Sequence, residues 1–166
     1  MKNGYLILVL MLGLAACSGA GSKKSAVASG PLANLKIMDL KGNNIDWTAT
    51  DGPVLLNMWA TWCRPCKQEM PSLDAAWKTL EKEGWSFYAI SNEPAEVISG
   101  FQQQMPYTFP MAQLDGDFQE LNIYSIPTTY VISKKGQLVS VEVGARDWNS
   151  PASISKLREL ADREVK

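Results

Sequence analysis

Two cysteines, Cys63 and Cys66, are separated by two residues at the junction between an apolar run and a helix-forming stretch. The apolar run, residues 54–60, predicts a strand that is buried on both faces, and the stretch over residues 64–83 predicts a helix. This order places Cys63 at a helix N-terminus, where unpaired backbone N–H groups favour negative charge and so stabilise a thiolate. A thiolate with a second thiol one helical turn away can make and break a disulfide bond.

A C-x-x-C pair has two other interpretations, half of a tetrahedral zinc site and a purely structural disulfide. The chain has three cysteines and no histidine, so the second half of a zinc site cannot be found. A structural disulfide of this spacing closes a very short loop and gains little from chain entropy. The lack of histidine also excludes Ser-His-Asp and Cys-His nucleophile systems. We therefore expect no metal and no cofactor.

The first sixteen residues predict a targeting segment that is not part of the fold. Lys2 gives a short positive region, and the apolar run over residues 5–14 is shorter than the ~20 residues of a membrane-spanning helix. Small residues directly precede Cys17, which resembles the lipobox of bacterial lipoproteins, where cleavage precedes the cysteine and its thiol receives a lipid. The pattern predicts a lipoprotein signal peptide over residues 1–16 and lipidation of Cys17. A plain cleavable signal with a stray cysteine is the alternative.

The rest of the chain predicts one tethered domain. Residues 17–32 are small, polar and rich in glycine, which is typical of a flexible tether, and residues 33–166 form the folded unit. With 46% hydrophobic residues the chain can bury a core, and its formal charge of −1 gives no indication of nucleic-acid binding. We expect a monomer that is lipid-anchored and extracytoplasmic, facing the periplasm, with the outer membrane as one possible location.

Hydrophobic periodicity and turn residues predict an α/β fold in which helices flank a central mixed sheet. Two short segments are expected in addition to the main order of elements: an extended piece over residues 109–112 and a helical segment over residues 117–121. That order consists of a hairpin over residues 35–47, a strand at 54–60, a helix at 64–83, a strand at 85–91, a helix at 95–105, strands at 128–133 and 138–143, and a helix at 151–164.

Two stretches of the chain resemble the signatures of a known family. Residues 57–71, which contain Trp62-Cys63-Arg64-Pro65-Cys66, resemble the active-site run of the thioredoxin superfamily, and more narrowly its TlpA/ResA-like branch of secreted, membrane-attached thiol-disulfide oxidoreductases. Ile126-Pro127-Thr128 resembles the second signature of the superfamily, a proline preceded by a cis peptide bond. The resemblance covers residues 33–164 in element order. It implies a thioredoxin-like three-layer sandwich with an N-terminal β-hairpin extension.

The resemblance implies roles for the cysteines and the proline loop. Cys63 is expected to be the exposed, attacking thiolate, and Cys66 the more buried resolving thiol of a redox-active disulfide. The loop at Pro127 is expected to face the cysteines and to offer the backbone of Ile126 to an extended substrate strand. An ordinary trans proline at the start of a strand is the alternative for Pro127.

Neighbouring residues are expected to affect the protonation and reactivity of the Cys63–Cys66 pair. Asn57 stands where ordinary thioredoxins carry a buried aspartate, and asparagine cannot titrate. Glu69 is then the candidate for proton handling, with a solvated helix residue as the alternative. Trp62 is expected to cover the site and to pack on the substrate. A cationic Arg64 should lower the pKa of Cys63.

The resemblance implies a disulfide reductase that acts on secreted proteins. Apocytochrome c is the best-known substrate of that branch, and a membrane electron donor would re-reduce the cysteines. Two alternatives stay open: a disulfide oxidase or isomerase of the same fold, and a copper-delivery protein that binds the metal through Cys63 and Cys66. The lack of histidine argues against copper.

Overall fold

The structure is a computed structural model that describes residues 30–165. The predicted signal peptide over residues 1–16, the lipidation site at Cys17 and most of the expected tether lie outside the described residues. Within residues 30–165, no helix has the length and apolar character needed to cross a bilayer.

Within the described part of the chain, seven strands form one mixed sheet in the order β2-β1-β5-β4-β3-β6-β7. The central strand β3 runs parallel to β4 and antiparallel to β6, so the expected mixed sheet is confirmed. The strands are β1 (Ile37–Met38), β2 (Asn44–Ile45), β3 (Val54–Met58), β4 (Ser86–Ser91), β5 (Met111–Leu114), β6 (Thr128–Ile132) and β7 (Leu138–Val143).

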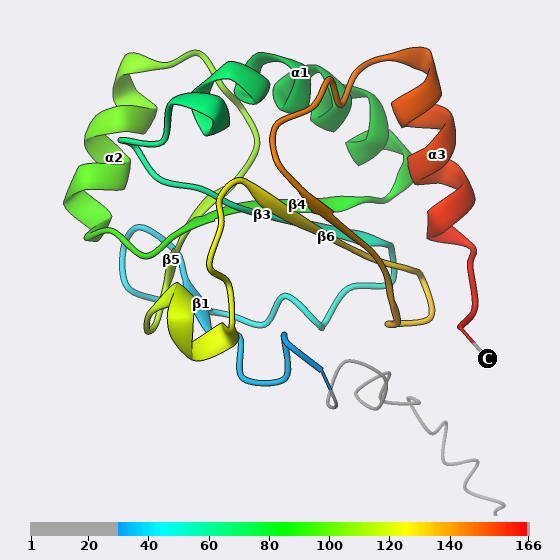
Figure 1. Cartoon of the computed structure of the whole chain (residues 1–166), viewed down its shortest axis with the longest axis horizontal. Coiled ribbons are helices and arrows are strands. Elements are labelled where there is room, and N and C mark those ends of the chain that lie inside the picture. Colours follow the sequence, from blue (N-terminus) through cyan, green and yellow to red (C-terminus); the bar gives the residue numbers. More distant parts are fainter. Residues whose placement is uncertain (1–29, 166) are drawn as a thin grey trace, which may run out of the picture.

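Side chains alternate across β3 and divide the core between the two faces of the sheet. Leu55 packs with the helices α1 (Arg64–Leu80), α2 (Ala95–Gln104) and α3 (Pro151–Ala161), which together cover one face (Figure 1). Leu56 belongs to the opposite core, which the chain before β3 and the 3-10 helix η2 (Phe118–Leu121) cover. The three layers of the expected sandwich are therefore present.

The extended piece expected over residues 109–112 is a full member of the sheet. β5 pairs in parallel with β4 and antiparallel with β1, and β1 pairs with β2. The N-terminal hairpin is therefore the edge of the main sheet, joined to it through β5. A four-residue strand directly after Pro110 carries too short a pattern to be recognised from periodicity.

The helix that carries the cysteines ends a turn earlier than expected. α1 stops at Leu80 and continues as the 3-10 helix η1 (Glu81–Glu83), after which Gly84 takes a φ of +84°. Glycine adopts this left-handed conformation without steric cost, so it closes the helix and leads the chain into β4.

Candidate active site

Cys63 caps the N-terminus of α1. Its backbone is extended, with φ −75° and ψ 103°, and its Sγ accepts a hydrogen bond from the backbone N–H of Cys66 at 3.3 Å. Pro65 stands in the first turn, where its missing N–H leaves no intrahelical bond unmade. A reduced Sγ at this position faces the positive end of the helix dipole, which stabilises the thiolate over the thiol.

The two sulfurs form a disulfide with an S–S distance of 2.05 Å and a Cα–Cα distance of 5.3 Å. Cys66 is fully buried, as expected, but Cys63 is only 4% exposed, so the expectation that Cys63 is exposed is wrong for the disulfide form. Its Sγ lies 3.8 Å from the carbonyl oxygen of Ile126, because the loop before β6 packs directly against it. Cys63 nevertheless keeps the only solvent-accessible edge of the pair.

The loop that faces the disulfide contains the cis peptide bond between Ile126 and Pro127, as expected. Thr128 Oγ1 donates to the carbonyl of Ser125 at 2.7 Å, and the backbone N–H of Gly144 donates to the carbonyl of Pro127 at 2.8 Å. Pro127 is buried and Ile126 is half-buried. The loop is thus held from both sides while the backbone of Ile126 faces the sulfur.

Glu69 is buried on the inner face of α1, with 3% of its surface exposed. Its Oε1 accepts a hydrogen bond from Asn57 Nδ2 at 2.8 Å, and its Oε2 accepts bonds from Trp148 Nε1 at 2.9 Å and from the backbone N–H of Arg146 at 3.2 Å. The alternative of a solvated helix residue is therefore wrong. Glu69 lies one turn beyond Cys66, so these two side chains share a face of the helix.

Burial raises the pKa of the Glu69 carboxyl above 4.5, although the bonds from Asn57, Trp148 and Arg146 act in the opposite direction. A carboxyl with a raised pKa can change its protonation state closer to neutral pH than a solvated one. The site therefore contains a titratable group beside the resolving cysteine.

Asn57 joins Glu69 to the central strands. Its Nδ2 donates to Glu69 Oε1 and to Thr129 Oγ1, both at 2.8 Å, whereas its buried Oδ1 has no hydrogen-bond partner among the described residues. As expected for an amide, Asn57 supplies a fixed donor and leaves titration to the carboxylate.

Three contributors to the site were not identified from the sequence. Trp148 gave no signal that could be separated from core packing, yet its indole holds Glu69, and the guanidinium of Arg146 lies 5.5 Å above the same indole ring. Glu93 accepts hydrogen bonds from the backbone N–H of Thr61 at 2.7 Å and from Thr61 Oγ1 at 2.6 Å. Glu93 thereby fixes the turn that leads into the cysteines.

Trp62 directly precedes Cys63 in the chain and is exposed to solvent. It is 71% exposed, and it lines a groove of about 250 Å³ together with Tyr124 and Ile126. Since Ile126 also contacts Cys63, this groove begins at the disulfide. Trp62 is therefore available to an incoming polypeptide.

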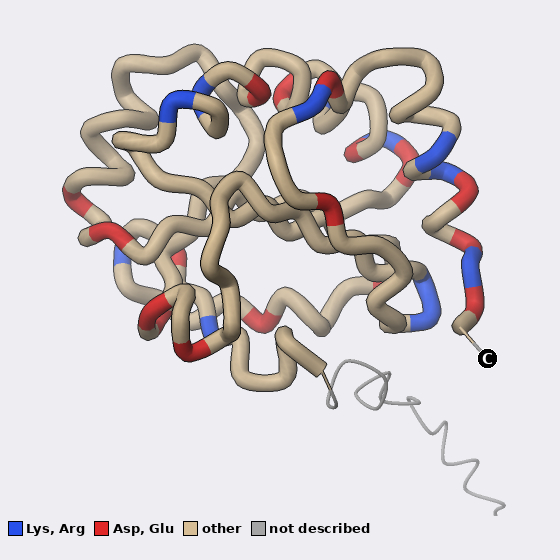
Figure 2. Tube along the Cα trace, viewed as in Figure 1, with Lys and Arg blue, Asp and Glu red and all other residues tan. Residues whose placement is uncertain are grey.

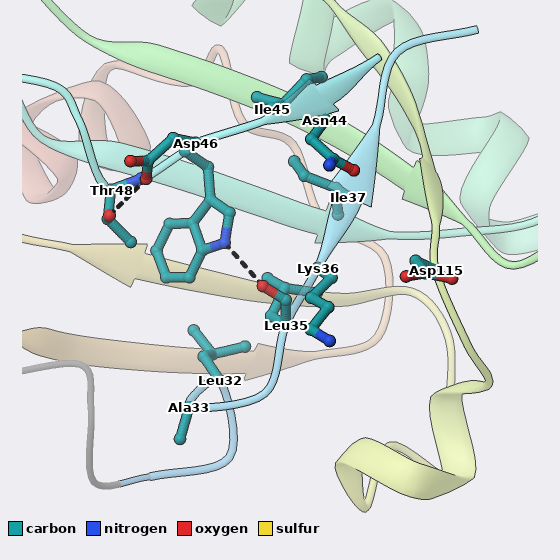
Figure 3. A pocket seen from close by; sticks show the side chains of 11 residues that line it. Leu32, Ala33, Leu35, Lys36, Ile37, Asn44, Ile45, Asp46, Thr48 and Asp115 are labelled. Carbon is teal, nitrogen blue, oxygen red and sulfur yellow. Dashed lines mark hydrogen bonds between the residues drawn. The ribbon is translucent and has the colours of Figure 1, made fainter. Parts of the chain in front are cut away.

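A larger cavity, of about 590 Å³, lies at the β1–β2 edge of the sheet and contains no cysteine. Trp47 lines this cavity, and its Nε1 donates to the carbonyl of Leu35 at 3.1 Å, a hydrogen bond that Figure 3 draws as a dashed line. Lys36, Asp46 and Asp115 also line it. Neither this cavity nor any other part of residues 30–165 gathers three or more potential metal ligands.

The fold and the site define a thioredoxin-like thiol-disulfide oxidoreductase, with a helix-capping C-x-x-C disulfide against a cis-proline loop. Comparison with protein families agrees: residues 29–141 match the AhpC/TSA family. The chain belongs to this family, and within it to the ResA thiol-disulfide oxidoreductases.

Sequence relatives support the narrower assignment. The thiol-disulfide oxidoreductase ResA of Geobacillus kaustophilus is 32% identical over 145 residues, which cover 84% of this chain and 83% of the relative. ResA of Bacillus subtilis is 31% identical, with coverage of 84% and 80%.

Solved structures confirm the fold. StoA from Bacillus subtilis superimposes with a TM-score of 0.58 at 20% identity, covering 76% of this chain and 96% of that one. A thiol:disulfide interchange protein from Chlorobium tepidum gives a TM-score of 0.61 at 23% identity, with coverage of 76% and 91%.

Proposed function

We propose that this oxidoreductase works as a reductase outside the cytoplasm, where it transfers two electrons from Cys63 and Cys66 to disulfides of secreted proteins. The observation that carries this proposal is the position of the Cys63–Cys66 pair, with Cys63 at the N-terminus of α1 and against the backbone of Ile126. This position favours the thiolate form of Cys63, which is the form that attacks a disulfide. The reducing direction rests on the resemblance to the ResA-like branch.

The reaction is a pair of thiol-disulfide exchanges. The Cys63 thiolate attacks one sulfur of the substrate disulfide, which forms a mixed disulfide and releases the other substrate sulfur as a thiolate. The Cys66 thiolate then attacks Cys63 Sγ, closes the internal disulfide and releases the second substrate thiolate. A membrane electron donor returns two electrons to the oxidised pair.

Glu69 acts on the second step. Cys66 is fully buried, so its thiol must lose a proton inside the protein before it can attack. The Glu69 carboxylate is the titratable group nearest in sequence on the same helix face, and its raised pKa suits it to accept that proton. Ile126 and Pro127 bind the backbone of the substrate strand, and Trp62 packs against it.

The residues before Cys17 and the similarity to ResA support this location and these partners. A lipid on Cys17 would hold the domain at the outer face of a membrane, within reach of a membrane electron donor. Apocytochrome c, which must keep its haem-binding cysteines reduced, is a substrate of suitable chemistry.

Trapping of mixed disulfides tests the proposed activity. In Cys66→Ala of the full chain the first exchange proceeds and the second cannot, so secreted substrates should accumulate as mixed disulfides on Cys63. Mass spectrometry of the non-reduced adducts identifies them, and Cys63→Ala is the matched control that should trap none. Equal adduct formation by the two variants would contradict the assignment of Cys63 as the attacking thiol.

The direction of electron flow needs a separate measurement. Alkylation of whole cells with a mass-tagged maleimide should find Cys63 and Cys66 mostly reduced at steady state. A mostly oxidised pair would instead support a disulfide oxidase.

A further inference from the structure

The groove that begins at the disulfide is lined by exposed aromatic side chains and by a carboxylate. Its walls include two strongly exposed aromatic side chains, Trp62 at 71% and Tyr124 at 77%. Large exposed aromatic side chains that line one groove are typical of a polypeptide-binding site. Ile126 lies between the groove and Cys63, so a chain whose cysteine reacts at Cys63 has its neighbouring residues in the groove.

The charge of the groove is negative. Among the described residues that line it, Asp117 alone has a charged side chain. Its carboxylate is held in place, because Oδ1 accepts the backbone N–H of Gln119 at 2.9 Å and Oδ2 accepts Asn92 Nδ2 at 3.3 Å. These neutral donors orient the carboxylate but leave its charge uncompensated.

The surroundings add to this charge. Asp115 and Glu120 are exposed, two and three positions from Asp117 in the sequence. Figure 2 shows acidic positions along the segment that includes η2. None of the three forms an ion pair with another residue of the described range. A carboxylate beside two exposed aromatic rings suits a cation, which gains from both the charge and the ring faces.

We propose that this groove docks substrate polypeptides that carry a lysine or arginine within a few residues of the reactive disulfide. The cationic side chain lies between Asp117 and the faces of Trp62 and Tyr124, while the substrate cysteine reaches Cys63. This inference rests on the proposed function and adds a substrate class to it: segments with basic residues beside the cysteine are reduced faster than acidic ones.

The test uses the pre-reduced full-length protein and two peptides that each contain one internal disulfide. The peptides differ only in the residue next to one cysteine, which is Lys in one and Glu in the other. We expect the second-order rate constant of single-turnover reduction to be about fivefold higher for the Lys peptide. This ratio corresponds to the free energy of one contact of a cation with an aromatic ring and a partly exposed carboxylate. About 0.5 M NaCl should remove much of this advantage, because it shortens the screening length to a few ångströms.

Asp117→Asn keeps the side-chain acceptor for Gln119 but removes the charge, so it should lower the rate for the Lys peptide and bring the two peptides close together. Glu81→Gln, the matched loss of one carboxylate at the far end of α1, should keep the wild-type preference. Equal rates for both peptides with the wild-type protein, or an undiminished preference in Asp117→Asn, would overturn this inference.

A neutral small disulfide, bis(2-hydroxyethyl) disulfide, separates this result from failure of the proposed function. Reduction of this compound with no charge preference among the peptides refutes only the docking inference. If neither peptide nor the small disulfide is reduced, the reductase activity itself is wrong.

Discussion

At the scale of single residues, the chemistry depends on the electrostatic surroundings of Cys63. The sulfur accepts the N–H of Cys66 and lies at the positive end of α1, and both interactions favour its ionised form. In the disulfide form, the loop at Ile126 packs against this sulfur and leaves little of Cys63 exposed.

The exposed cation at position 64 should contribute to this stabilisation. Arg64→Glu replaces a positive with a negative charge next to Cys63, so we expect the pKa of the Cys63 thiol to rise by several tenths of a unit, a size limited by solvent screening. The rate of alkylation of the reduced protein against pH measures it. Lys82→Glu, in η1 at the other end of the helix, should leave the pKa unchanged. An unchanged or lower pKa in Arg64→Glu would show that Arg64 has no such effect.

Residues whose role follows from local sequence were predictable, whereas residues brought together by the fold were not. The position of Cys63 at a helix start follows from the strand-turn-helix order, and the cis proline follows from its motif. The bond between Trp148 and Glu69 joins residues 79 positions apart, so no local pattern indicates it. The burial of Cys63 depends in the same way on Ile126, 63 positions away.

At the scale of elements, close approach of two turns fixes the strand that leads to the cysteines. Gly52 immediately precedes the Pro53-β3 entry, and a Cβ added there would lie 1.8 Å from the carbonyl oxygen of Gly84. The backbone at Gly52 leads into β3, and the backbone at Gly84 lies between η1 and β4. The long helix was predictable from its helix-forming stretch and β3 from its uninterrupted apolar run, but this contact and the short strand β5 depend on the packed sheet.

This contact predicts different outcomes for two glycines. Gly52→Ala should destabilise the protein by about 2 kcal/mol or more, because backbone must move to relieve the overlap. Gly100→Ala should stabilise it by about 0.5–1 kcal/mol, because alanine is the better helix former and a Cβ in α2 meets nothing within 4 Å. Urea unfolding of both variants measures these changes. Wild-type stability in Gly52→Ala would contradict the described approach of the two turns.

At the scale of the whole molecule, the buried carboxylate of Glu69 connects three parts of the fold. Glu69 lies in α1, and the partners of its carboxylate come from β3 and from the segment between β7 and α3 that carries Arg146 and Trp148. Protonation of this one group therefore affects the stability of the assembled fold. Because burial raises its pKa, the folded protein binds this proton more tightly than the unfolded chain does.

The sign of the pH dependence follows from this difference. Between pH 4.5 and the folded pKa, unfolding releases a proton, so the free energy of unfolding falls as pH rises through that window. The loss amounts to about 1.4 kcal/mol for each unit by which the pKa is raised. Glu69→Gln lacks this titrating group. The free energy of unfolding of the variant, relative to that of wild type, should therefore increase as pH rises through the same window. The Asn57 amide can turn its unpartnered Oδ1 toward the new glutamine N–H groups.

Urea titrations of wild type and Glu69→Gln at a series of pH values test this prediction. A difference that stays constant from pH 4 to pH 8 would show that Glu69 titrates as an ordinary solvated carboxyl.

The ionisation of Cys63 is the claim on which the proposed chemistry depends, and the pH profile of its alkylation in the reduced wild-type protein measures it most directly. The helix N-terminus and the N–H of Cys66 predict an apparent pKa well below the ~8.5 of a free cysteine. A pKa at or above that value would contradict the account.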